Sequence, residues 1–146
     1  MHAWRLTHAE GETTLTYDPY GLQVIQVKQP DGCITRVQHD YRLLQPISIT
    51  DPNGTTEQAL YDAFGRLLAT SIHGQASATS VGFGPLSAYR RPVDASIESA
   101  IQAPATILGE AARAWLYDPF SWMGSIATTD RQANWVTQRY VSPDGH

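Results

Sequence analysis

The segment Tyr61-Asp62-Ala63-Phe64-Gly65-Arg66-Leu67-Leu68 combines the signals that decide the fold. Asp at the first position and Gly at the fourth position are typical of a type I β-turn. The Asp62 side chain can accept a hydrogen bond from the backbone two residues further on, and Gly65 tolerates a positive φ. The segment therefore predicts a tight turn that leads into a strand.

This turn signal recurs along the chain at a constant spacing. Asp18, Asp40 and Asp62 occupy positions i, i+22 and i+44, and each follows an aromatic or imidazole side chain. Three further segments match at the same offset: Pro30-Asp31-Gly32 with Pro52-Asn53-Gly54, Leu22 with Leu44, and Val24-Ile25-Gln26-Val27 with Pro46-Ile47-Ser48-Ile49. Independent features that agree on one period indicate a tandem repeat. About two and a half units are visible, from Gly11 to Gly74.

Each unit reads as strand, turn, strand, turn. Ile47-Ser48-Ile49-Thr50 alternates apolar and polar residues, as a half-buried strand does. Asp18-Pro19-Tyr20-Gly21 fits a type I turn well, whereas Asp40-Tyr41-Arg42-Leu43 lacks the Gly and predicts a weaker or longer turn. Pro-Asp-Gly and Pro-Asn-Gly mark tight hairpins at the other strand ends. A meander of antiparallel hairpins is expected, in which each hairpin packs on its neighbours.

The repeat pattern is interrupted after Gly74. Residues 75–84 predict a loop or a poorly patterned strand, and Asp94-Ala95-Ser96 then supplies helix caps. Pro104 either ends the first helix or opens a second one at its first position. The apolar residues of this stretch have helical spacing: Ile97, Ala100, Ile101, Ile107, Leu108, Ala111, Ala112 and Trp115. Tyr117-Asp118 looks like a return of the repeat motif, followed by a strand at 135–141 and a turn at 142–145.

The predicted fold is mainly β, with antiparallel β-hairpin repeats that form a strip of curved sheet and one or two short inserted helices. Three regions are expected: hairpin repeats at 1–74, a loop and helical insertion at 75–114, and truncated repeat-type strands at 115–146. The repeat motif assigns a structural role to ten residues: Tyr17, Asp18, Gly21, Asp40, Tyr61, Asp62, Gly65, Arg66, Tyr117 and Asp118.

Composition excludes several classes of protein. Charged residues make up only 16% of the 146 residues, and the net charge is −4. No apolar run is long enough to span a membrane, and residues 1–10 lack the apolar region of a Sec-type signal peptide. Lys28 is the single lysine, so no basic stripe exists for nucleic acid. Cys33 is the single cysteine, which excludes an internal disulfide and a cysteine-based zinc site.

The Tyr-Asp and Gly-Arg-Leu pattern resembles the YD repeats of the RHS family, and Tyr61 to Leu67 is nearly the consensus. Two further stretches resemble the B component of bacterial ABC-type toxin complexes, the insecticidal Tc toxins. One is Asp40-Tyr41-Arg42-Leu43-Leu44-Gln45-Pro46 followed by Thr50-Asp51-Pro52-Asn53-Gly54, and the other is Ala105-Thr106-Ile107-Leu108-Gly109 ahead of Tyr117-Asp118. The resemblance runs from about Thr16 to the C-terminus.

This resemblance implies a structural role in toxin delivery. In the family, a much longer B component joins a C component to build a hollow shell of spiralling hairpins. The shell holds an unfolded cytotoxic effector polypeptide until a pore-forming A component receives it. The chain is accordingly expected to be a fragment of the shell wall in a secreted, virulence-related complex. Its expected partners are the C component and the effector, with the A component reached through the full-length B protein. Few charges would let the lumen hold an unfolded chain without gripping it electrostatically.

Other functions receive less support from the residues. Tyr and Trp are abundant, which leaves a cell-surface YD-repeat module that binds carbohydrate as the alternative. No enzymatic activity, cofactor or metal is expected, because the histidines lack metal-ligand spacing and the repeated aspartates are explained by turn capping. His39 is expected to pack in the sheet, and Cys33 has no base nearby in the sequence. Arg139 to Asp144 resembles the RHS core segment that precedes an aspartyl self-cleavage site in C components, but the further motifs of that site are missing.

Overall fold

The computed structural model describes residues 3–8, 11–76, 79–118 and 138–141. The strands are β1 (Ala3–His8), β2 (Gly11–Tyr17), β3 (Val24–Lys28), β4 (Ile34–Asp40), β5 (Gln45–Thr50), β6 (Thr56–Tyr61), β7 (Leu67–Ala76), β8 (Thr79–Gly82), β9 (Arg113–Tyr117) and β10 (Gln138–Val141). The helices are η1 (Leu86–Ala88), α1 (Ile97–Gln102) and α2 (Pro104–Leu108). The mainly β prediction with short inserted helices is confirmed.

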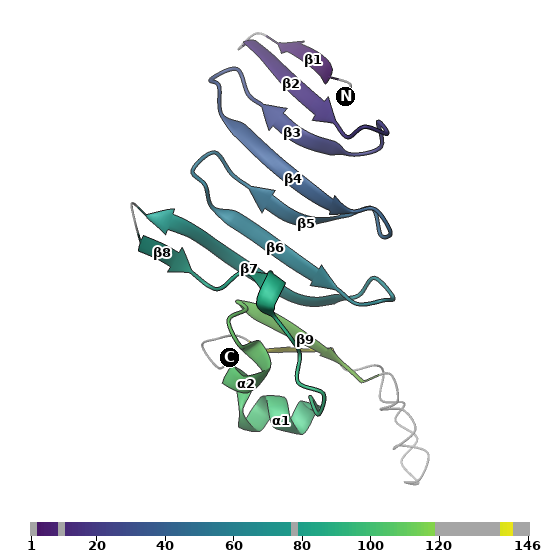
Figure 1. Ribbon diagram of the computed structural model, residues 1–146, viewed down its shortest axis with the longest axis vertical. Helices are drawn as coiled ribbons and strands as arrows, with labels where there is room; N and C mark the ends of the chain where they lie inside the picture. Colours follow the sequence, from purple (N-terminus) through teal and green to yellow (C-terminus); the bar gives the residue numbers. More distant parts are fainter. Residues whose placement is uncertain (1–2, 9–10, 77–78, 119–137, 142–146) are drawn as a thin grey trace.

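All described strands belong to one open antiparallel sheet. The order is β1-β2-β3-β4-β5-β6-β7-β9-β10, and β8 pairs with the second half of β7. From β1 to β7 the order in space follows the order in the sequence, so the strands stack as a ladder of hairpins (Figure 1). β7 uses the rest of its free edge to pair with β9 at Ala69 and Thr70.

The hairpin turns follow one another at half of the repeat spacing seen in the sequence. Turns begin at residues 18, 29, 40, 51 and 62, and in each one the backbone N–H three residues later donates to the carbonyl of the first residue. Successive turns lie at opposite edges of the sheet, because consecutive strands are antiparallel. One edge therefore collects the Tyr-Asp turns at 18, 40 and 62, and the opposite edge collects the turns at 29 and 51.

The turn at Asp40 is the longer turn that the missing Gly predicts. Its αL position is occupied by Leu44 at φ 54°, which is the only non-glycine residue with positive φ in the described chain. In the turn at Asp18 the αL residue is Gly21, at φ 70°, one position earlier in the turn. Both Leu43 and Leu44 donate their N–H groups to the Asp40 carbonyl, which closes the turn without glycine.

Residues 75–84, for which the sequence allows a loop or a strand, contain β8, which extends the sheet beside β7.

α1 begins at the Ser96 N-cap, whose hydroxyl accepts from the Ser99 N–H while the Ser99 hydroxyl accepts from the Ser96 N–H. α2 begins at Pro104, so the second of the two predicted roles of this proline is the observed one. The helical spacing expected as far as Trp115 is wrong beyond Leu108, where α2 ends, because residues 113–117 form β9 and pair with β7 and β10. None of the described helices has the length and apolar character that a bilayer crossing requires. The turn expected at 142–145 and the start of the strand expected at 135–141 lie outside the described residues.

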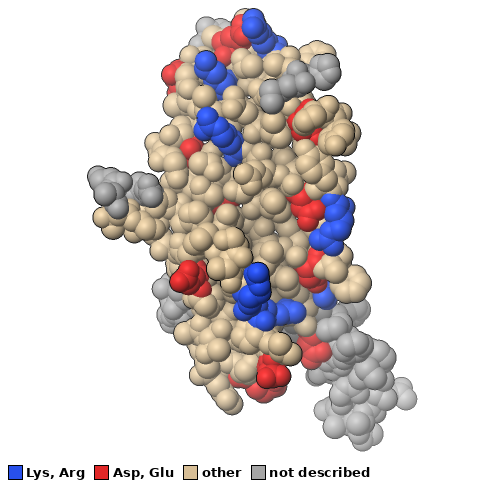
Figure 2. All heavy atoms as spheres, in the orientation of Figure 1, with Lys and Arg blue, Asp and Glu red and all other residues tan. Residues whose placement is uncertain are grey.

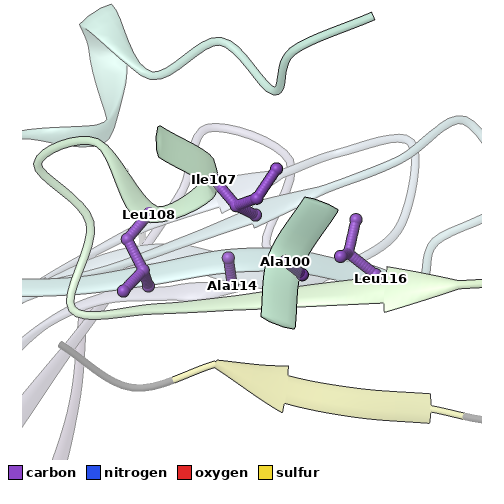
Figure 3. Close-up of a cluster of buried hydrophobic side chains, with 5 residues drawn as sticks. All are labelled: Ala100, Ile107, Leu108, Ala114 and Leu116. Carbon is purple, nitrogen blue, oxygen red and sulfur yellow. The ribbon is translucent and has the colours of Figure 1, made fainter. Parts of the chain in front are cut away.

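The buried apolar side chains gather where the helices cover β7 and β9. Ala100 of α1 and Ile107 and Leu108 of α2 pack on Ala114 and Leu116 of β9 (Figure 3). A second cluster joins Leu86 of η1 to Ala69 and Ala111. Polar contacts fix the insert to the sheet: the Leu86 N–H donates to the Gln58 side chain at 2.8 Å, and the Ser71 hydroxyl donates to the Gly84 carbonyl at 2.6 Å.

Candidate functional site: a column of turns beside a two-faced sheet

The Tyr-Asp turns stack on one another along one edge of the sheet, and we call this edge the turn column. It consists of the turns at residues 18–23, 40–45 and 62–66, with Tyr117 at the end of β9. Figure 1 shows the three turns one above another, and Figure 2 shows charged atoms of both signs along the same edge. The ten residues of the predicted repeat motif fall on this edge: nine lie in a turn or at the end of a strand that leads to it, and Asp118 directly follows β9.

Each aspartate of the column holds its own turn. Oδ1 of Asp62 accepts from the backbone N–H groups of Phe64 at 2.8 Å and Arg66 at 2.9 Å. Oδ1 of Asp18 accepts from Leu22 at 2.7 Å, and Oδ1 of Asp40 accepts from the Arg42 N–H at 2.8 Å. A carboxylate that accepts several backbone N–H groups satisfies donors that the sheet leaves unpaired.

The Asp62 carboxylate is also paired with a cation. Arg66 Nε lies 2.7 Å from Asp62 Oδ2, and the Arg66 guanidinium lies 4.7 Å from the centroid of the Tyr117 ring. Burial alone would raise the pKa of Asp62. The Arg66 N–H and guanidinium, together with the Phe64 N–H, outweigh burial and hold the pKa below its ordinary value. Asp62 is therefore ionised at neutral pH and suits a turn clamp better than an acid catalyst.

Asp18 is the most enclosed member of the column. Its side chain is only 1% exposed, and Oδ2 has no hydrogen-bond partner within 3.5 Å in the described part of the chain. Burial favours a raised pKa, but the nearby Tyr41 hydroxyl and the N–H groups of Leu22 and Gln23 outweigh it, so the pKa of Asp18 is lowered. The same contact with Asp18 raises the pKa of Tyr41. The Asp18 carboxylate of the first turn and the Tyr41 phenol of the second turn therefore lie close together.

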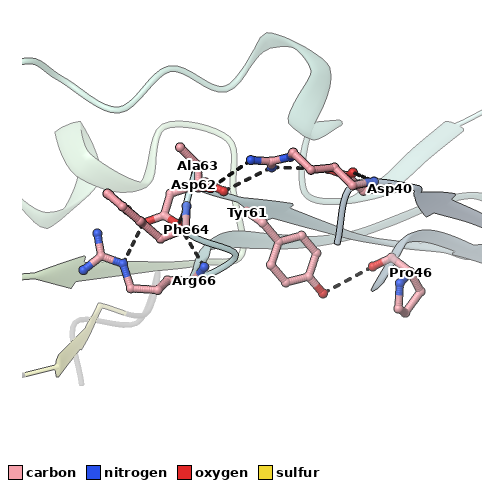
Figure 4. A network of polar contacts seen from close by, with 8 residues as sticks. Asp40, Pro46, Tyr61, Asp62, Ala63, Phe64 and Arg66 are labelled. Carbon is pink, nitrogen blue, oxygen red and sulfur yellow. Dashed lines mark hydrogen bonds and ion pairs between the residues drawn. The ribbon is translucent and has the colours of Figure 1, made fainter. Parts of the chain in front are cut away.

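Further contacts run between consecutive turns of the column. The Tyr20 ring meets the Tyr41 ring edge to face, with 6.0 Å between centroids. Arg42 reaches across to the next turn, where Nη1 donates to the Ala63 carbonyl at 3.0 Å and Nη2 donates to the Asp62 carbonyl at 3.2 Å. The network around Asp40 and Asp62 is drawn in Figure 4.

Tyr61 links neighbouring strands just below the turns. Its hydroxyl donates to the Pro46 carbonyl at 3.3 Å (Figure 4). Tyr17 and His39 occupy the same place in their own units. At all three positions the ladder shifts register, after Thr16, Gln38 and Leu60, and these shifts are again one repeat unit apart. A bulge increases the local twist and bends a strand, so the motif combines a clamped turn with a repeated irregularity beside it.

Sequence reasoning missed Arg42 and Asp51. No arginine recurs 22 residues before or after Arg42, so the sequence alone does not distinguish Arg42 from an arginine exposed to solvent. Asp51 caps the opposite-edge turn as Asp62 caps its own, because Oδ1 of Asp51 accepts from Asn53 at 2.9 Å and Thr55 at 2.8 Å. Asp51 lies midway between Asp40 and Asp62 in the sequence, and this even spacing is the signal that could have revealed its role.

Within the described residues, Cys33 and His39 lie in the strip of hairpins and do not lie in a cluster of metal-ligating side chains. Asp31 lies next to the half-buried Cys33, and the hydrogen bond to its carboxylate raises the pKa of the thiol, which disfavours the nucleophilic thiolate. His39 lies at a register shift of β4, and its Nδ1 has no hydrogen-bond partner among the described residues. In the described ranges, no group of three or more His, Cys, Asp or Glu residues could hold a metal ion.

The sheet has two chemically different faces. The polar face carries a cross-strand row of Thr16, Gln26, Arg36, Thr50 and Thr56, and the insert with its helices covers one end of this face. The apolar face carries two rows, Trp4-Leu15-Val27 and Val37-Ile49-Glu57-Ile72, each linked by direct register. Among described strand residues that point to the apolar face by this register, only Glu57 and Arg113 are charged.

The combination of an open hairpin ladder, a repeat unit of two strands and clamped Tyr-Asp turns defines an RHS-type repeat sheet. The sequence matches no protein-family model and no curated protein. Solved structures do match. The chain is similar to a part of the TcdB2-TccC3 crystal structure, with a TM-score of 0.70 and 25% identity over 82% of this chain. It is also similar to a part of the Tc holotoxin pore of Photorhabdus luminescens, with a TM-score of 0.67 and 25% identity over 77% of this chain.

These matches bear out the resemblance to RHS-type Tc toxins that the repeat motifs indicate. A third structure, TcdB2-TccC3-Cdc42, matches at 23% identity with a TM-score of 0.70 and shows the same fold. The chain spans 6% of the matched chain in TcdB2-TccC3 and 5% in the holotoxin pore. The fold is therefore that of a segment of an RHS-type toxin component.

Proposed function

We propose that this chain serves as a wall segment of a shell that encloses an effector polypeptide, as the B component does in Tc-type toxin complexes. The observation that carries the proposal is the match of 82% of the chain to a part of TcdB2-TccC3 at a TM-score of 0.70. The open ladder supports it, because a strip with two chemically different faces suits a wall between two compartments.

The proposed role is structural and extracellular, and it uses no catalytic residue. The partners would be the C component, the enclosed effector and, through the rest of a B protein, the pore-forming A component.

The enzymatic alternative, self-cleavage of the chain, has a direct test. Mass spectrometry of the purified chain after prolonged incubation is expected to show one intact species, and a discrete cleavage product would contradict a purely structural role.

A segment exchange tests the wall proposal. Residues 11–117 of this chain would replace the structurally equivalent segment of the matched TcdB2-TccC3 chain, and the hybrid complex would be produced in full. We expect a closed particle that elutes like the parent complex and has its outline in negative-stain electron microscopy. Failure of the hybrid to form a particle, when reinsertion of the native segment succeeds, would count against the proposal.

The chain offers a matched control for this exchange. Deletion of residues 40–50 removes one turn and one strand, so every later strand would run in the opposite direction and the Tyr-Asp turn at 62 would move to the other edge. The hybrid with this deletion is expected to form no closed particle. A shell that forms equally well with the deletion would show that the inserted segment does not contribute to the wall.

The carbohydrate alternative stays a prediction. Trp4 is 66% exposed and lines a hollow with Tyr17 at the end of the sheet, and an exposed aromatic ring can stack on a sugar. A titration with mono- and oligosaccharides that follows tryptophan fluorescence checks it, and Trp4→Phe serves as the control variant.

A further inference from the structure

The apolar face contains a hollow over β5, β6 and β7. Its volume is about 580 Å³, and its lining includes Ile47, Ile49, Ala59, Ile72 and Phe83. Ile49 is 37% exposed and Ile72 is 40% exposed, so the apolar side chains of the hollow remain accessible in the folded chain. A concave surface of this size with a mainly apolar lining is typical of a binding site.

Glu57 lies on β6, the middle strand of the hollow, at the end of the lining that this strand contributes. In the ladder it is the direct partner of Ile49 on one side and of Ile72 on the other, so each isoleucine is about one strand spacing, ~4.8 Å, away. Its side chain is exposed, and it forms no hydrogen bond or ion pair with any residue that the structure describes. Arg113, the other charged lining residue, lies two strands further along the sheet, on β9.

A single carboxylate between two apolar side chains selects the chemistry of an occupant. Burial of the isoleucines against a partner removes water from Glu57 as well, and a buried carboxylate needs a cation or donors from that partner. The Tyr61 hydroxyl, which also lines the hollow, already donates to the Pro46 carbonyl. The complementary partner therefore offers apolar groups and a lysine or arginine side chain a few ångströms apart.

An extended polypeptide provides this combination. In an extended chain alternate side chains point to the same side and repeat at about 6.6–7 Å, so an apolar residue and a basic residue two positions apart can reach Ile72 and Glu57 together. The neutral backbone of such a segment would lie over the small side chains of Ala59 and Thr70. An anionic lipid surface would be repelled by the unpaired Glu57 carboxylate.

We propose that this hollow binds an extended polypeptide segment in which apolar residues alternate with basic ones, and that Glu57 selects the basic residue. The inference rests on the proposed wall function, because it assigns the apolar face to the side that meets the enclosed polypeptide. Glu57 acts here as a specificity residue for the peptide.

Fluorescence anisotropy with the full 146-residue chain tests the inference. The probe is a short labelled peptide in which valine alternates with lysine, and the comparison probe replaces every lysine with glutamate. We expect saturable binding of the lysine probe that weakens between about 50 mM and about 300 mM salt. Glu57→Gln should weaken it by about fivefold, and Ile72→Thr should weaken it at both salt concentrations.

Glu12→Gln is the matched control, because Glu12 lies on the polar face and pairs with Arg5 at 3.1 Å. This variant removes the same charge and should leave the affinity of the lysine probe unchanged. The inference is overturned if both glutamine variants bind alike, if the glutamate probe binds as well as the lysine probe, or if no probe binds. Particle formation in the segment exchange reports on the wall role independently, so a hybrid that assembles without peptide binding would overturn this inference alone.

Discussion

The strip of hairpins and the corner under the helices stabilise the same sheet in different ways. Every buried apolar residue in the described chain lies at position 69 or later, where η1, α1 and α2 cover β7 and β9. Before position 69 the one buried side chain among the described residues is the carboxylate of Asp18. The corner therefore has a conventional core, whereas the strip depends on backbone ladders, clamped turns and half-buried side chains that a neighbouring surface could cover.

This contrast explains why the strip is so regular. A core tolerates irregular elements because burial of apolar area is non-directional. A strip without a core gains its stability from directional contacts, which are hydrogen bonds in each turn and side-chain contacts between neighbouring turns. Directional contacts of this kind require the same geometry in each unit, and the even spacing of the turns along the chain supplies it.

The largest expected effect is in the corner. Leu116 is 4% exposed and packs with Ile107 and Ala100. Leu116→Ala should lower the free energy of unfolding by about 2–5 kcal/mol, because it removes buried methyl groups and leaves a cavity. Urea denaturation followed by circular dichroism measures the change, and Leu22→Ala, at a side chain that is 64% exposed in the strip, serves as the control. Equal effects of the two substitutions would remove the distinction between corner and strip.

The second largest effect is expected when the carboxylate that holds the turn at 62–66 is removed. Asp62→Ala removes the acceptor of two N–H groups and the partner of Arg66, and we expect a loss of about 1–3 kcal/mol in the free energy of unfolding near neutral pH. Urea denaturation measures the loss. Asp94→Ala, at an exposed residue ahead of α1, is the control and should change little.

The same clamp predicts a pH dependence. Because the folded-state pKa of Asp62 lies below the ordinary value of 3.8, the carboxylate stabilises the fold fully above that value and loses this contribution as the pH falls through the folded-state pKa. The difference between the wild-type protein and Asp62→Ala should therefore be constant above about pH 5 and shrink below about pH 4. Denaturation curves at several pH values check this, and a difference that grows on acidification would contradict the assignment.

A smaller pair of effects separates backbone strain from contact between turns. Gly65 and Gly21 both have positive φ, at 81° and 70°. A Cβ at Gly65 would lie 3.1 Å from Leu43 Cδ2, whereas a Cβ at Gly21 would meet nothing within 4 Å. Each Gly→Ala substitution should lower stability by about 1 kcal/mol through the left-handed backbone. Gly65→Ala should lower stability slightly more than Gly21→Ala, because its new methyl group meets Leu43 of the neighbouring turn. Thermal denaturation measures both losses. A smaller loss for Gly65→Ala would show that this contact between turns does not affect stability.

The smallest expected effect tests the link between turns. Arg42→Ala removes the hydrogen bonds to the Asp62 and Ala63 carbonyls from a half-exposed side chain, and we expect a loss of about 0.5–1 kcal/mol. Relative to the wild-type protein, the variant should show faster backbone hydrogen exchange in the turn at 62–66. Exchange in the turn at 51–55, which Arg42 does not contact, should change little. The control Arg90→Ala removes an arginine that bonds only to nearby carbonyls.

Much of the strip could be predicted because its information is local. The Asp, Pro, Asn and Gly residues of the turns at 18, 29, 51 and 62 specify these turns by themselves, and alternation specifies the strands between turns. The Ser96 cap and Pro104 likewise mark where the helices begin. Three features depend on contacts between distant residues: the position of the helical insert over β9, the pairing of β9 with β7, and the contact of Arg42 with the next turn of the column. No local pattern in one sequence encodes them.

The candidate site shows the same division. The ten motif residues were found because they repeat, yet Asp51 was overlooked because its turn was assigned to Pro52-Asn53-Gly54 alone. The hollow at Glu57 has no sequence signal, since a lone Glu in an alternating strand is typical of a solvated side chain. Its apolar surroundings come from Ile49 on β5 and Ile72 on β7, which only the register places beside it.

The period of the turns also links gene length to the dimensions of the protein. One repeat unit adds two strands, or about 10 Å of sheet perpendicular to the strands, and it restores both the strand direction and the edge on which the next Tyr-Asp turn lies. Duplication or loss of the codons for one unit would therefore lengthen or shorten such a sheet, while each face and each edge would keep the same kinds of residues. A change of half that size would exchange the two edges, so recombination between whole units offers a simple route to walls of different extent.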